Sequence, residues 1–96
     1  MFVITVKFVT NDQHAEKFKN RVLKQAQDSL KFEEQCHVFD VCHDPNDMNV
    51  VFLYEVYTDK NAFEAHLNSD HYLGFNEEVT PWIIEKQVNQ LIKQKL

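Results

Sequence analysis

Two histidines and one carboxylate are the residues best suited to acid–base chemistry in this sequence. His66 and His71 stand five residues apart in AFEAHLNSDHY, residues 62–72. An imidazole gains and loses its proton near neutral pH, so either histidine is a candidate base. Glu55 is the one charge in the apolar run 50–57, where a carboxylate is costly unless it is solvated, paired or protonated. Structural roles stay open as alternatives for all three. The histidines could be hydrogen-bonded core residues, and Glu55 could form an ion pair or point to a solvated strand edge.

The spacing of these residues argues against a metal centre. His-x4-His is not the i, i+4 pair of a helical zinc site, and neither a cysteine nor a carboxylate stands at ligand spacing beside it. The single glycine, Gly74, cannot build a phosphate-binding loop, a dinucleotide fingerprint or a nucleophile elbow. We therefore predict neither a metal nor an organic cofactor, and expect acid–base groups to act alone in an aromatic-lined cavity.

The elements that must position these groups begin with a strand and a helix. Residues 2–9 carry apolar side chains on both alternating faces, which predicts a strand covered on both sides. Thr10 or Asn11 can cap a following helix, and apolar residues then recur at helical spacing. The pattern predicts a long amphipathic helix from about 11 to 31.

A hairpin is expected next. The strand-like runs 36–43 and 49–57 are joined by DPND, in which proline presets a turn and the Asp and Asn side chains can bond the local backbone. If the turn centres near residue 46, His37 lies opposite Glu55, and a slip of one residue would change the neighbours of both.

The candidate histidines fall in the next helical segment. Thr58 is the expected N-cap of a helix that carries His66 on the same face as Ala62, Phe63 and Leu67. Residues five apart would not converge along one unbroken helix, but a break at Asn68–Ser69 would let Ser69 cap a second, short helix with His71 in its first turn. A last strand is expected within residues 84–92.

This order of elements predicts an α+β fold, the ferredoxin-like βαββαβ arrangement, with both helices on one face of a four-stranded antiparallel sheet. The chain should form one domain over residues 1–96. Strands 2–9 and 50–57 are apolar on both sides, so the uncovered sheet face would be a large exposed patch. A second copy packed sheet to sheet, giving a homodimer, is the simplest remedy.

Composition narrows the location and the partners. A net charge of −5 argues against a nucleic-acid partner, and no apolar run approaches the roughly 20 residues of a membrane span. Six residues of continuous strand separate Cys36 from Cys42 by about 20 Å, too far for a disulfide. We expect a cytoplasmic protein with two free thiols, more suited to packing than to nucleophilic attack.

Three segments together carry a resemblance to a known family. They are EEQCHVFDVCHDP, FLYEVYTDKNAFEAH and SDHYLGF, in which an acidic residue precedes a Cys-containing strand, a Tyr-Glu pair lies on the next strand, and Ala-x3-His and Ser-x-His follow. In this order they resemble the antibiotic biosynthesis monooxygenase (ABM) family of small dimeric α+β barrels, in particular its quinol monooxygenase-like and LsrG-like members. The chain departs from the family pattern at Gln35, where a glycine is usual, and in its C-terminal segment.

The resemblance implies a pocket between sheet and helices with Glu55, His66 and His71 in its wall. Aromatic side chains would bind the substrate there: Phe39, Tyr54, Phe63 and Tyr72. The implied activity is cofactor-independent monooxygenation of a quinol or polyphenol, in which His66 or His71 takes a proton and Glu55 holds the imidazolium.

Two other functions stay open from the sequence. The first is an LsrG-like isomerase acting on phosphorylated autoinducer-2, for which the only phosphate-binding groups that the sequence suggests are the start of the Ser69 helix and Lys7. The second is a dimeric module that binds a ligand without turnover.

Overall fold

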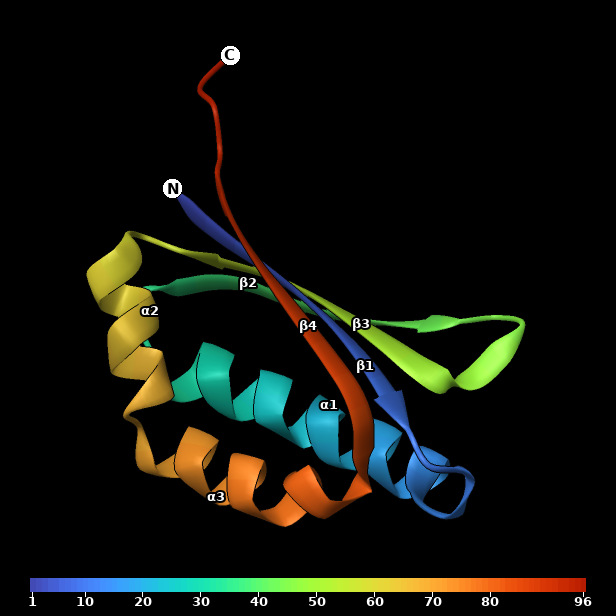
Figure 1. Ribbon diagram of the computed structural model, residues 1–96. Coiled ribbons are helices and arrows are strands. Elements are labelled where there is room, and N and C mark those ends of the chain that lie inside the picture. Colours follow the sequence, from blue (N-terminus) through green and yellow to red (C-terminus); the bar gives the residue numbers. More distant parts are fainter.

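All 96 residues are described by the structure, a computed structural model. The elements follow in the order β1 (Phe2–Thr10), the 3₁₀ turn η1 (Asp12–His14), α1 (Ala15–Phe32), β2 (Cys36–Asp44), β3 (Asp47–Tyr57), α2 (Lys60–Leu67), α3 (Asp70–Val79), the 3₁₀ turn η2 (Thr80–Trp82) and β4 (Ile83–Ile92). The strands form one antiparallel sheet in the order β2-β3-β1-β4. The helices lie together on one face of this sheet (Figure 1), which confirms the predicted ferredoxin-like α+β fold.

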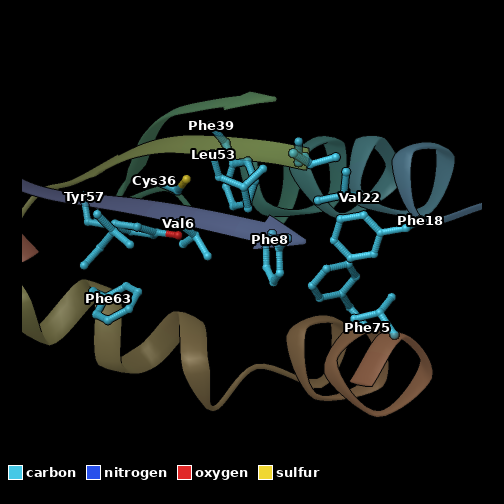
Figure 2. Close-up of a cluster of buried hydrophobic side chains, with 14 of the residues drawn as sticks. Val6, Phe8, Phe18, Val22, Cys36, Phe39, Leu53, Tyr57, Phe63 and Phe75 are labelled. Carbon is cyan, nitrogen blue, oxygen red and sulfur yellow. The ribbon is translucent and has the colours of Figure 1, made fainter. Parts of the chain in front are cut away.

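Strand β1 lies inside the sheet, and of the two covered faces that its sequence predicted, the helices cover one (Figure 1). It pairs with β3 on one side and with β4 on the other. Its residues Ile4, Val6 and Phe8 are almost fully buried and face the helices, as Figure 2 shows for Val6 and Phe8. Its next neighbours Thr5 and Lys7 therefore lie on the opposite face, which no helix covers.

Helix α1 begins later than its sequence predicted. Asn11 is the cap, with its side chain accepting from the backbone N–H of His14 over 2.9 Å, but the first turn is the 3₁₀ turn η1. The expected apolar stripe then packs against the sheet, and Phe18 meets Phe8 edge to face at a ring-centroid distance of 4.9 Å. Gln25 lies on the same buried face, which places an amide at the sheet side of this helix.

The hairpin register differs from the prediction. Phe39, not His37, pairs with Glu55. One irregularity follows the Asp44↔Asp47 pair at the turn, and a second lies between Cys36 and Val38. The first irregularity lies between the turn and Glu55, so it alone moves the partner of Glu55 by two residues from the prediction, whereas the second lies beyond Glu55. His37 forms a 2.7 Å hydrogen bond with Thr58.

The predicted break between α2 and α3 is confirmed. Ser69 caps α3 by accepting from the N–H of Tyr72 over 3.3 Å. The predicted cap of α2 is wrong: Asp59 accepts from the N–H of Ala62. Thr58 lies one residue before this cap, and its hydroxyl bonds with Gln35 and His37.

The two faces of the sheet are covered differently. Figure 2 shows core side chains from the sheet and the helices meeting in the layer between them. On the other face the side chains of Phe52, Tyr54 and Leu91 are 40%, 37% and 52% exposed. We call this apolar surface, with the half-buried Val9 and Val50 beside it, the open sheet face.

Cys36 is buried and Cys42 exposed, and both are free thiols as expected. Burial raises the pKa of the Cys36 thiol to about 12, which leaves it a packing residue rather than a nucleophile. None of the helices combines the length and the apolar character that crossing a membrane requires.

Candidate active site

A cavity of about 320 Å³ lies between the sheet and the helices. Its volume is at the lower end of the range for small-molecule sites, so it suits a ligand of one or two rings. Most of its wall is apolar and comes from both layers: Ile4, Val6, Phe8, Phe39, Leu53, Phe63, Leu67, Tyr72, Phe75 and Val88. The polar part of the wall consists of five side chains: Gln25, Glu55, His66, Lys86 and Gln90.

His66 is positioned by a carboxylate from the end of α1. Its side chain lies on the buried face of α2 and is 2% exposed. Nδ1 of His66 lies 2.7 Å from Oε2 of Glu33, and because a carboxylate accepts hydrogen bonds, Nδ1 is the donor. In the neutral ring the other nitrogen, Nε2, then carries a lone pair and no proton. It has no hydrogen-bond partner in the protein, and the ring lines the cavity.

His71 lies behind His66 rather than in the cavity wall. The two rings have centroids 5.9 Å apart, and Nε2 of His71 is 2.8 Å from the same Glu33 oxygen. This contact is not aligned as a hydrogen bond, so Nε2 of His71 is left without a partner. On its other side, Nδ1 of His71 accepts from the side-chain amide of Gln25 over 3.0 Å.

Glu55 projects from β3 into the core and is 3% exposed. Burial raises its pKa to about 7, although the hydrogen bond from Tyr57 and the charge of His66 both act in the opposite direction. The Tyr57 hydroxyl donates to Oε1 of Glu55 over 2.6 Å, and burial raises the pKa of that phenol as well. Glu55 therefore exchanges its proton near neutral pH from inside an apolar wall.

The cavity gathers five of the seven residues expected at the site: Phe39, Glu55, Phe63, His66 and Tyr72. His71 contacts this group from behind. Tyr54 does not belong to it, because strand alternation turns it away from Glu55 and onto the open sheet face. The expected cation, Lys7, is on that face too, and the cation in the cavity wall is Lys86 of β4.

Glu33 is the site residue that sequence reasoning missed. We expected Glu55 to hold the imidazolium, but the carboxylate in contact with His66 comes from a position 33 residues earlier. The two histidines therefore have a carboxylate within ligand distance, although none lies at ligand spacing from them in the sequence. The available signal was the acidic start of EEQCHVFDVCHDP, one of the segments that carry the family resemblance.

Comparison with solved structures places the fold among known ones. A Nitrosomonas europaea protein, provisionally assigned as an antibiotic biosynthesis monooxygenase, superposes with a TM-score of 0.93 at 24% identity, over 99% of this chain and 100% of its own. A Pseudomonas aeruginosa protein gives 0.89 at 21% identity, over 98% and 94%. A provisional monooxygenase from Lactobacillus acidophilus gives 0.88 at 26% identity, over 95% of this chain but 44% of its own.

Among curated protein sequences, none matches the chain. The family comparison is decisive, since residues 1–78 match the antibiotic biosynthesis monooxygenase model, from β1 through nearly all of α3. This match covers most of the chain and includes Glu33, Glu55 and both histidines of the site. The chain therefore belongs to the antibiotic biosynthesis monooxygenase (ABM) family.

Proposed function

We propose that the protein is a cofactor-independent monooxygenase acting on a small quinol or polyphenol. The observation that carries the proposal is the hydrogen bond by which Glu33 orients His66, with Nε2 of His66 left free beside an apolar cavity. A base held in one tautomer at a water-poor wall is suited to removing a phenolic proton. The aromatic side chains of the wall offer flat surfaces against which the substrate ring can pack.

The chemistry requires the substrate to supply the electrons. Ground-state dioxygen reacts poorly with closed-shell molecules, but a hydroquinone anion is electron-rich enough to reduce it. A hydroquinone and dioxygen give a hydroxyquinone and water, so one oxygen atom enters the ring and the other leaves as water. No external reductant is needed, and the protein has to form the anion and exclude bulk water.

His66 and Glu55 divide the proton transfers in this proposal. Nε2 of His66 takes the phenolic proton, and Glu33 stabilises the imidazolium that results. Glu55, with its pKa of about 7, is partly protonated at neutral pH and can donate to the reduced oxygen species or to the second ring oxygen. Tyr57 fixes the Glu55 carboxyl by its 2.6 Å hydrogen bond.

We also propose that the protein acts as a homodimer joined through the open sheet face. Phe52, Tyr54 and Leu91 form part of an apolar surface that no helix covers. The cavity lies on the other side of the sheet, so a second copy would support its floor without entering it.

The isomerase alternative has less support from the cavity wall. A phosphorylated sugar-like substrate would need convergent cations or free helix amides. Lys86 is the one cation in the wall, and its ammonium lies over the ring of Phe8 at 5.6 Å. An apolar wall with a single lysine favours an aromatic substrate over a phosphate ester.

Oxygen consumption tests the proposal. The untagged protein would be incubated with a panel of one-ring and two-ring hydroquinones, with and without a metal chelator, and product formation followed by mass spectrometry. We expect chelator-resistant oxygen uptake with one atom of labelled dioxygen in the product. Turnover of a phosphorylated sugar without oxygen uptake would favour the isomerase. Thermal stabilisation by these compounds without turnover of any would favour a binding module.

A further inference from the structure

We propose that Glu33, His66 and His71 form a binding site for one divalent transition-metal ion of the zinc class, and that the bound ion switches His66 from a base to a hydrogen-bond donor. The second half of this inference rests on the proposed function, since it concerns the same base. The first half stands on the geometry of the three side chains alone.

The three donor atoms already converge. Oε2 of Glu33 lies 2.7 Å from Nδ1 of His66 and 2.8 Å from Nε2 of His71, and all the ligand atoms lie within 4.8 Å of one another. Two imidazoles and one carboxylate are a recurrent protein donor set for zinc, with further positions taken by water. Imidazole nitrogens favour zinc, cobalt or nickel over calcium and magnesium, which prefer oxygen ligands.

One buried atom without a partner lies at this site, and a second belongs to Gln25, whose amide contacts His71. Nε2 of His71 forms no hydrogen bond, and neither does Oε1 of Gln25, whose side chain is 1% exposed. A metal ion at Nε2 of His71 would satisfy the first atom. The metal would leave the proton of the His71 ring on Nδ1. A half-turn of the Gln25 amide would then bring its Oε1 to the position from which its Nε2 now bonds to Nδ1 of His71. A histidine that binds a metal usually donates its other N–H to such an acceptor.

The location also suits a cation that arrives from solvent. The side chains of Glu33 and His71 are each 15% exposed, whereas that of His66 is nearly enclosed. Glu33 brings a negative charge directly to the donor atoms. The ion would therefore bind at the rear of His66, on the opposite side of the ring from the cavity.

The consequence for His66 follows from its two nitrogens. When Glu33 accepts the proton of Nδ1, Nε2 has a lone pair and can act as a base. When a metal ion takes the lone pair of Nδ1, the proton of the neutral ring must sit on Nε2. The nitrogen at the cavity then donates and cannot accept. Metal binding and base catalysis by His66 are therefore mutually exclusive.

Metal binding is tested first, without reference to activity. Untagged protein stripped with a chelator would be titrated with Co²⁺, followed by its visible absorption, and then with Zn²⁺ by calorimetry. We expect one site per chain that Zn²⁺ takes over from Co²⁺. Gln25→Ala should weaken binding by ~10–100-fold, the usual effect of removing an outer partner, and Glu33→Gln or His71→Ala should weaken it more.

The matched control is the double variant His37→Ala/His43→Ala, which removes two exposed histidines and keeps the three proposed ligands. It should bind as the unmodified chain does. If the control loses the metal, or if His71→Ala and Glu33→Gln keep full affinity while circular dichroism shows them folded, the site is refuted. Failure of the unmodified chain to bind at all refutes it as well.

The switch is then tested by ¹⁵N NMR of the histidine rings. Before zinc is added, the proton of His66 should be on Nδ1, and after zinc it should be on Nε2. Loss of oxygen uptake in parallel would support the regulatory role. If the proton moves but no substrate is ever oxidised, the proposed function fails while the metal site stands. If zinc binds and the proton stays on Nδ1, the switch is refuted.

Discussion

Nδ1 of His66 in α2 donates a 2.7 Å hydrogen bond to Oε2 of Glu33 at the end of α1, although the two residues are 33 positions apart in the sequence. Glu33 is the residue at which α1 ends, and its own N–H still bonds to the carbonyl of Ser29. The helix terminus therefore fixes the backbone of the carboxylate before the side chain reaches His66. Because Glu33 is fixed at a helix end, its hydrogen bond keeps the His66 ring in one orientation before any substrate binds.

Replacing Glu33 by Gln should lower turnover by at least about tenfold, because the amide gives weaker support to the imidazolium that forms during the reaction. The neighbouring Glu34→Gln, at an exposed position, is the matched control and should keep the rate of the unmodified chain. Steady-state oxygen uptake with each variant measures the effect. Equal rates for the two variants would remove Glu33 from the mechanism.

The two histidines should differ in importance. His66→Ala should lower turnover by at least ~10²-fold, the order of magnitude that general base catalysis contributes. His71→Ala should have a smaller effect, because His71 is outside the cavity wall and contacts Glu33 without an aligned hydrogen bond. Oxygen uptake by both variants, each shown to be folded by circular dichroism, makes the comparison. A larger loss for His71→Ala would assign the base to that residue instead.

Sequence patterns were sufficient for the fold, because it follows from local periodicity, and together with the family resemblance they named five of the fifteen residues that line the cavity. Alternation in 2–9 and 50–57 and the cap at Ser69 set the elements that bring Glu55 and His66 to one cavity. The partner of His66 could not be found this way, since its contact with Glu33 depends on how two distant helices pack. The register was missed because irregularities in a hairpin are not visible in an alternating pattern.

The open sheet face should hold two chains together. We expect the unmodified protein to sediment with twice the chain mass of 11.4 kDa at micromolar concentration. The double variant Phe52→Glu/Tyr54→Glu should sediment as a single chain with its secondary structure intact, because both positions are already partly exposed in one copy. Leu73→Glu, which changes an exposed apolar residue on α3, is the control and should remain dimeric. A single-chain mass for the unmodified protein would contradict the proposed dimer.

The buried carboxyl of Glu55 should make stability fall as the pH rises toward neutrality. Its pKa of about 7 in the folded chain is above the ordinary value of 4.5, so between these values the unfolded chain loses a proton that the folded chain keeps. The free energy of unfolding is therefore not reduced below about pH 4.5. It falls between about pH 4.5 and about pH 7 and then levels off, with a total loss of at most about 3 kcal/mol.

Glu55→Gln removes the titratable carboxyl, and the oxygen of the new amide can still accept the hydrogen bond from the Tyr57 hydroxyl. Urea unfolding at a series of pH values should therefore show the variant gaining stability over the unmodified chain from about pH 4.5 to about pH 7. Glu85→Gln, at an exposed position of β4, should give a difference that does not change with pH. A pH-independent difference for Glu55→Gln would mean that Glu55 ionises freely in the folded chain. A carboxyl with that freedom would not hold a proton near neutral pH, and its role as the proton donor of the reaction would have to be abandoned.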